Sequence, residues 1–360
     1  MMRLDDREWK DFAVPEIFQN IQRGKRLKNA DHIPGIVPYV SSTANNNGVD
    51  DYIEASAGTR VFKNCISLAN SGSVGTAFYE PFAFVASDHV TSLECKEANE
   101  YIYLFLTAVL EQQGSNFNFN REINDLRIKK MRVMLPVTDE GKPDFQFMED
   151  FIRELMAAKR KQYRTYVEKR LKSLGLDIAN EGGYSKVLKS RQWLSFRIDT
   201  IFNILPGKRL VAADSTPGDR PFIGALDNSN GVARFVSDKN ESLDKNVLGV
   251  NYNGNGMVIG FYHPYECIFS DDVKRFHLKD REDDPFVLLF MKTTILMQKQ
   301  KFGYLYKFNA DRMAHTSIML PVTDAGQPDY DFMESFGRKM MSNKYNQYLA
   351  FLAMSDTIKA

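Results

Sequence analysis

The hydrophobic pattern changes character twice along the chain, and in the same way both times. The first part, up to residue 143, has short apolar or alternating runs at 37–40, 65–68, 82–86 and 132–135. Clusters of Gly, Asn, Ser and Pro separate these runs, which is typical of short strands joined by turns. Only the stretch 99–110 reads as a helix in this part. We therefore expect a β-rich globular domain with one helix.

A long helix is predicted directly after this domain. From Asp144 onward, apolar residues such as Phe147, Phe151 and Leu155 recur at helical spacing, and neither Gly nor Pro interrupts them until Gly175. Asp144 is well placed to cap the first turn. A helix of ~30 residues would be ~45 Å long, and the same pattern returns from Asp329.

The chain is an internal repeat. Residues 135–149 read LPVTDEGKPDFQFME and residues 320–334 read LPVTDAGQPDYDFME, with 11 of 15 positions identical at an offset of 185. Upstream, the Gly-Lys-Arg-Leu sequence at 24–27 recurs at 207–210, and the segment 37–49 aligns with 220–232. Self-similarity over this length indicates two copies of one structural unit.

The predicted fold class is α+β: a tandem repeat of two mixed, β-rich domains separated by two long helices. An isolated helix would leave its apolar stripe uncovered, so we expect the two helices to pack as an antiparallel coiled coil. The predicted boundaries are 1–143 and 193–328 for the domains, 144–175 and 329–360 for the helices, and 176–192 for the linker.

Composition narrows the function classes. The 360 residues carry 47 basic and 46 acidic side chains, so a uniformly polycationic nucleic-acid coat is excluded, although local basic faces are not. The 3 cysteines and 5 histidines have no metal-ligand spacing, and we predict no metal site. The start of the chain is charged, and no apolar run approaches the ~18 residues of a membrane span. We expect a cytoplasmic protein.

Two similar domains held apart by helices are suited to reading two separated sites on DNA. A ~45 Å spacer corresponds to roughly thirteen base pairs at ~3.4 Å each. Because the two domains differ in their loops, each could read a different sequence.

The order of motifs carries a family resemblance. W-x-x-F, G-K-R-L, P-Y-V-S, N-N-G-V, G-S-V-G and L-P-V-T-D-x-G-x-P-D are followed by a long helix and then repeated. This order resembles the specificity (S) subunit of restriction–modification systems over essentially the full length. The resemblance implies two target-recognition domains, each reading one part of a bipartite double-stranded DNA site. The helices would set the spacing and dock methyltransferase and endonuclease subunits.

The start of the helix points to a subtype. Type I specificity subunits usually begin it with a P-x-L-x-E-Q-x-x-I-like signature, whereas this chain has L-P-V-T-D-x-G-x-P-D. That form looks more like type IIB systems, whose partner is a fused nuclease–methyltransferase. The sequence leaves the choice between the two open.

Signatures of catalysis are missing from the sequence. It contains neither an (N/D)-P-P-(Y/F) methyltransferase motif nor a (D/E)-x-K nuclease motif after Pro143-Asp144 or Pro328-Asp329. We predict a non-catalytic subunit without a cofactor, with base flipping left to the partner. Two alternatives remain: a tandem carbohydrate- or small-molecule-binding protein, and a nuclease with an unrecognised active site.

Candidate DNA contacts fall into four groups, each of which could also be an ordinary turn or solvated surface. Cations after a glycine could neutralise phosphates, and amides or hydroxyls on loops could contact base edges. The cations are Lys25, Arg26, Lys208 and Arg209. A first polar loop supplies Ser41, Ser42, Thr43, Asn45, Asn46, Asp227, Asn228 and Ser229, and a second supplies Ser71, Ser73, Asn251, Asn253 and Asn255. The approach to each long helix adds Arg121, Arg127, Lys129, Lys307 and Arg312.

Overall fold

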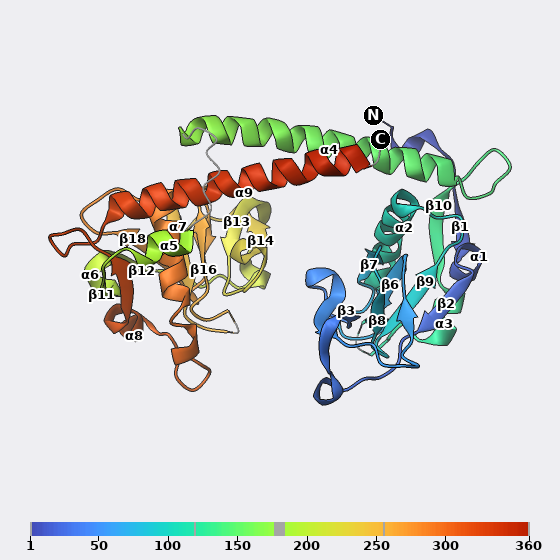
Figure 1. The fold of residues 1–360 in the computed structure, drawn as a ribbon, viewed down its shortest axis with the longest axis horizontal. Helices are drawn as coiled ribbons and strands as arrows, with labels where there is room; N and C mark the ends of the chain where they lie inside the picture. Colours follow the sequence, from blue (N-terminus) through green and yellow to red (C-terminus); the bar gives the residue numbers. More distant parts are fainter. Residues whose placement is uncertain (1, 119, 176–183, 255, 359–360) are drawn as a thin grey trace. The chain divides into compact units, whose positions relative to one another are not determined.

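The structure is a computed structural model that describes residues 2–118, 120–175, 184–254 and 256–358. It divides into two compact units, Met1–Tyr163 (unit 1) and Arg164–Ala360 (unit 2). Figure 1 shows that each unit combines small sheets with short helices. Of the two long helices, one is divided between the units and the other lies in unit 2. The predicted linker overlaps residues 176–183, which lie outside the described part of the chain.

Unit 1 is built on three sheets. An antiparallel sheet has the order β2 (Asn20–Arg23), β9 (Val90–Glu94), β6 (Cys65–Ala69), β7 (Ala77–Glu80). A mixed sheet has the order β4 (Val49–Ile53), β3 (Pro34–Val40), β8 (Phe84–Ala86), β5 (Val61–Phe62), and β3 and β8 are parallel. Strand β1 (Trp9–Ala13) pairs with β10 (Arg132–Pro136). The helices are α1 (Val14–Ile17), α2 (Glu100–Gln112), α3 (Asp125–Lys130) and the first part of α4 (Phe145–Leu174).

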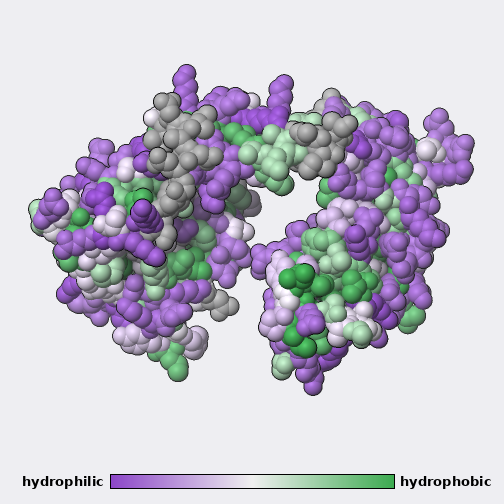
Figure 2. Space-filling model, in the orientation of Figure 1, coloured by the Kyte–Doolittle hydropathy of each residue, from purple (hydrophilic) through white to green (hydrophobic). Residues whose placement is uncertain are grey.

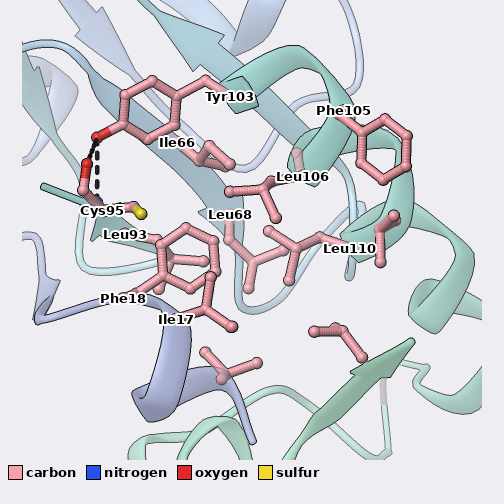
Figure 3. Packing of buried hydrophobic residues seen from close by; sticks show 14 of the residues in the cluster. Ile17, Phe18, Ile66, Leu68, Leu93, Cys95, Tyr103, Phe105, Leu106 and Leu110 are labelled. Atoms are coloured by element: carbon pink, nitrogen blue, oxygen red, sulfur yellow. Dashed lines mark hydrogen bonds between the residues drawn. The ribbon is translucent and has the colours of Figure 1, made fainter. Parts of the chain in front are cut away.

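The core of unit 1 lies between the antiparallel sheet and α2. Every residue of β6 is buried, and Figure 3 shows Ile66 and Leu68 of this strand facing Leu106 of α2. At one end of this core, the Tyr103 hydroxyl donates a hydrogen bond to the Cys95 carbonyl and accepts one from the Cys95 N–H, at 3.0 Å each. The predicted helix is confirmed, with the Asn99 side chain as its N-cap.

Unit 2 repeats this topology, except that its second sheet has three described strands instead of four. Its antiparallel sheet has the order β12 (Phe202–Pro206), β18 (Val273–Leu278), β15 (Val247–Asn251), β16 (Gly260–His263). A second sheet has the order β14 (Val232–Val236), β13 (Pro217–Ile223), β17 (Ile268–Phe269), and β11 (Trp193–Arg197) pairs with β19 (Ser317–Pro321). The helices are α5 (Tyr184–Lys189), α6 (Ile198–Ile201), α7 (Pro285–Leu296), α8 (Ala310–His315) and α9 (Tyr330–Ile358).

Both long helices begin with the same cap. The Asp144 carboxylate accepts from the Phe147 N–H at 2.9 Å, and Asp329 accepts from the Phe332 N–H at 3.0 Å. Arg7 and Arg191 donate to these two aspartates at 2.9 and 3.3 Å. The predicted caps are therefore confirmed, and each is tied to the strand region that starts its own domain.

Within unit 2, the end of α4 runs antiparallel to α9. The Tyr166 and Tyr345 hydroxyls are 3.4 Å apart, and the Arg170 guanidinium lies 3.8 Å from the sulfur of Met341. Residue numbers rise along one helix as they fall along the other. The predicted α+β repeat with two long helices is confirmed.

Candidate nucleic-acid interface

In unit 1, two polar loops meet at the end of β6. The first polar loop (residues 41–48) is closed by a Ser41 N–H bond to the Gly48 carbonyl at 2.9 Å. Asn46 and Asn47 adopt left-handed φ angles of 51° and 53°, which asparagine tolerates well. The second polar loop (residues 70–76) joins it through the Ser73 N–H and the Ser42 carbonyl, 3.1 Å apart. The structure thus brings together the two loops predicted from sequence.

Asn70 ties these loops to two further segments. Its N–H donates to the His89 carbonyl at 2.8 Å, and its carbonyl accepts from the Ile123 N–H at 3.0 Å. Its side chain accepts from the Thr91 hydroxyl at 2.6 Å. One end of unit 1 therefore gathers segments from four distant parts of the sequence.

The Gly-Lys-Arg segments reach the same end because glycine permits a close backbone approach. A Cβ on Gly24 would lie 2.1 Å from the Ser87 carbonyl oxygen, and one on Gly207 would lie 1.9 Å from that of Ser270. The following residues, Lys25 and Lys208, then pair through their N–H groups with β8 and β17, at 3.1 and 2.8 Å. Their side chains, and those of Arg26 and Arg209, are exposed.

The cations of unit 2 already have carboxylate partners. Lys208 lies 3.0 Å from Glu241, and Arg209 lies 3.6 Å from Asp271. Because these pairs are largely solvated, they contribute little to stability and can open to admit a phosphate.

Unit 2 holds its two polar loops together differently. Asn251 ends β15 and is only 1% exposed. Its side-chain amide donates to the Leu226 carbonyl of the first loop at 2.7 Å and to the Gly256 carbonyl of the second loop at 3.1 Å. Asn253 donates to Asp272 at 3.1 Å, and Asn255 lies outside the described residues. The buried Asn251 side chain thus holds the two loops together and is not available to a ligand.

A short hairpin stands beside the loops in each unit, closed by Asn118 and Arg121 in unit 1 and spanning 303–306 in unit 2. Arg121 and Asn118 exchange backbone bonds in the first hairpin, and Tyr306 and Gly303 do so in the second. Arg127 donates to the Glu122 carbonyl at 2.7 Å, and Arg312 donates to the Lys307 carbonyl at 2.8 Å. The two arginines therefore fasten the return strand of their hairpin in the same way.

The candidate residues differ in exposure. Ser71 and Asn251 are buried, and Ser71 bonds to the His89 ring. Partly buried are Ser41, Ser42, Thr43, Ser73, Asn253, Lys307 and Arg312. Exposed are Lys25, Arg26, Asn45, Asn46, Arg121, Arg127, Lys129, Lys208, Arg209, Asp227, Asn228 and Ser229. Tyr304 and Leu305, at the tip of the second hairpin, were not predicted as site residues, because Leu305 has no apolar counterpart in the first copy and an aromatic residue at the position of Tyr304 equally fits a core.

Three acid–base groups in the sheets have strongly shifted pKa values. Burial raises the pKa of Glu80 to about 7 and lowers that of His263 to about 4. Hydrogen bonds to Asp244 and Asp283 raise the pKa of His277 to about 9. Within the described ranges, no group of three or more His, Cys, Asp or Glu side chains could hold a metal ion.

Residues 6–163 and 190–348 each match the family model of the type I restriction modification DNA specificity domain. These matches cover most of the chain, which therefore belongs to the family of DNA specificity subunits of restriction–modification systems. The resemblance stated from the motif order is confirmed. None of the described helices is long and apolar enough to cross a membrane.

Individual proteins are similar to this chain over most of its length. The chain is 35% identical over 339 residues to the specificity subunit S.BcgI of a type II restriction enzyme from Heyndrickxia coagulans, covering 92% of this chain and 94% of that one. Among solved structures, the type I S subunit from M. genitalium aligns with a TM-score of 0.48 and 15% identity, over 99% of this chain and 96% of that one. The HsdS subunit from Thermoanaerobacter tengcongensis aligns with a TM-score of 0.32 and 12% identity, over 96% and 91%.

Proposed function

We propose that the loop-bearing end of each unit reads one half of a bipartite double-stranded DNA target. The supporting observation is that each unit gathers its polar loops, its Gly-Lys-Arg cations and its hairpin at one end, on the same scaffold but with different side chains. In this proposal, residues 1–143 and 193–328 are the target-recognition domains. The helices, 144–175 and 329–360, are spacers, joined to the second domain by 176–192.

The exposed side chains divide into two roles. Lys25, Arg26, Lys208 and Arg209 neutralise phosphates and fix the register of the duplex, which carries no sequence information by itself. Exposed amides and hydroxyls of the first polar loops, such as Asn45 and Asn228, reach base edges, where asparagine can pair with adenine through two hydrogen bonds.

Partner subunits complete the activity. The similar chain from H. coagulans is named as a subunit of a restriction enzyme, and the formal net charge of +1 leaves much of the phosphate clamp to other polypeptides. We therefore assign methyltransferase and endonuclease functions to separate subunits or to one fused polypeptide. This chain itself carries no catalytic step, and the partner flips the base to be modified.

Methylome sequencing tests the proposal. The chain and its modification partner are expressed in a host without methyltransferases of its own. A bipartite methylated motif is expected, and it disappears when this chain is omitted. Methylation that persists without the chain, or that lacks a two-part motif, contradicts the proposal.

A binding assay tests the phosphate contacts. The double variant Lys25→Ala/Arg26→Ala should weaken binding of the assembled complex to its motif and reduce the slope of log K against log salt by up to about 2. The double variant Lys63→Ala/Lys96→Ala is the control, since these exposed lysines lie at the opposite end of β6 and β9. An equal change in both double variants counts against an interface at the loop end.

A further inference from the structure

The hairpin of unit 2 ends in two large, exposed side chains. Tyr304 is 85% exposed and Leu305 is 96% exposed. Figure 1 shows this segment, the narrow loop between α7 and α8, projecting from the side of unit 2 opposite α9, and Figure 2 shows a hydrophobic tip at the same place. Leaving an apolar tip in water gains nothing for folding, which points to a use outside the fold.

The tip stands on a firm base. Gly303 and Tyr306 exchange backbone hydrogen bonds of 3.2 and 3.0 Å. The Tyr306 ring stacks on Phe302 with centroids 5.8 Å apart and an interplanar angle of 9°, and the Arg312 guanidinium lies 3.8 Å from the Tyr306 ring centre. Phe308 is fully buried, and its N–H lies 3.2 Å from the sulfur of Met257 in the second polar loop. The backbone beneath the tip is therefore held in place before a partner binds, which lowers the entropy cost of binding.

The surroundings of the tip are basic. Lys299, Lys301, Lys307 and Arg312 lie within fourteen residues of sequence, against the single carboxylate of Asp311. Asp311 lies 3.4 Å from the ring of His315. An apolar tip flanked by cations complements a duplex, in which bases lie between rows of phosphates, better than it complements an acidic or purely apolar surface.

Unit 1 presents a different tip on the same frame. Its hairpin is closed by Asn118 and Arg121, and Asn120 takes the place of Leu305. The fastening arginine, Arg127, is retained. The supporting frame is therefore repeated. In the sequence, the position of Tyr304 keeps an aromatic residue, Phe119, whereas Asn120 replaces Leu305, so Leu305 is the tip position that differs in kind between the two copies.

We propose that Tyr304 and Leu305 contact bases of the half-site that unit 2 reads, through apolar contacts such as those with thymine methyl groups or an opened base step. The inference rests on the proposed function and adds to it specificity-determining residues that carry no charge. The partner that the tip binds is the DNA duplex.

The experiment uses the assembled complex. Methylomes are compared for the wild type, Leu305→Asn and Tyr304→Asn. Each variant should keep the half-motif read by unit 1 and lose about tenfold in discrimination at one or two positions of the other half-motif. Met319→Asn is the matched control, because Met319 is 47% exposed on the β11–β19 sheet of the same unit. This control should leave the whole motif unchanged.

The outcomes separate the two proposals. A wild type without a bipartite motif refutes the proposed function. A wild type with such a motif, together with hairpin variants that methylate the identical motif, refutes only the role of the tip. Loss of partner subunits on purification of Leu305→Asn would also refute it, since the tip would then be a protein-docking element. If Leu305→Asn does not accumulate, Leu305→Ala repeats the measurement.

Discussion

The Ser67 hydroxyl donates a 2.9 Å hydrogen bond to the Glu80 carboxyl, and both side chains are buried in the antiparallel sheet of unit 1. The equivalent positions of unit 2 hold Gly249 and His263, in the same diagonal register across the strand pair. The two units thus fill one site in their common scaffold with different chemistry. At this site, Oε2 of Glu80 in unit 1 and Nε2 of His263 in unit 2 have no hydrogen-bond partner among the described residues.

Glu80 should make stability fall as the pH rises. Its pKa of about 7 lies above the ordinary 4.5, so ionisation is disfavoured in the folded state. The associated stability is fully present below about pH 4.5 and is lost as the pH rises to about 7. Glu80→Gln removes the ionisable group and with it this pH dependence. Relative to the wild type, the substitution should therefore raise the free energy of unfolding by up to about 3 kcal/mol more at pH 8 than at pH 4.5. Urea unfolding of the variant and the wild type at pH 4.5 and pH 8 measures this change. If the two proteins differ by the same free energy at both pH values, the raised pKa of Glu80 is contradicted.

Gly249→Ala should destabilise unit 2. The added Cβ would lie 2.9 Å from the Phe269 ring and 3.1 Å from the His263 ring. Overpacking of this kind costs about 1–3 kcal/mol. Because a smaller neighbour makes room, the double variant Gly249→Ala/His263→Ala should cost less than the sum of its single variants. Strict additivity in thermal unfolding would show that the rings do not oppose the methyl group.

His277 should stabilise unit 2 on the acidic side of its folded pKa. The ring lies 2.9 Å from Asp244 and 2.5 Å from Asp283. Since its pKa is raised from 6.5 to about 9, the stabilisation is complete below pH 6.5 and is lost between pH 6.5 and 9. His277→Gln should therefore lower the unfolding free energy by on the order of 2 kcal/mol at pH 6 and by much less at pH 9.5. Equal losses at the two pH values would contradict the charge pairing.

Gly24→Ala and Gly207→Ala should each disrupt one Gly-Lys-Arg segment. Their Cβ atoms would meet carbonyl oxygens at 2.1 and 1.9 Å, and backbone cannot move aside as a side-chain end can. We expect losses of more than 2 kcal/mol and weaker DNA binding. Gly114→Ala is the control, because the Cβ added there would lie 3.5 Å from its nearest neighbour, the Cα of Gly75, which is an ordinary contact distance. If the backbone amide of Lys25 exchanges its hydrogen as slowly in Gly24→Ala as in the wild type, the predicted disruption is contradicted.

The sequence predicts the long elements well and the short ones poorly. The helices from Phe145 and Tyr330 and the caps at Asp144 and Asp329 follow from sustained periodicity and local chemistry. The short helices α1 and α3 span four and six residues, which is too few for hydrophobic periodicity to reveal them from the sequence.

The candidate site was only partly predictable from the sequence. Polar composition locates its loops, but it does not reveal that Asn251 turns inward, because an inward amide and an exposed one have the same sequence pattern. Nor does it reveal Tyr304 and Leu305, since an apolar pair between charged residues equally fits a core position. Only the contacts around Arg312 and Phe308 identify the frame on which this pair is raised.

The matching bonds of Arg127 to Glu122 and of Arg312 to Lys307 have an evolutionary consequence. Because the fastening arginine bonds to a main-chain carbonyl, this bond places no demand on the side chains at the tip, such as those of Tyr304 and Leu305. These tip residues can therefore be substituted while the rest of the unit keeps its stability. A lineage carrying this chain could acquire new DNA preferences through changes at a handful of codons, without rebuilding the protein that displays them.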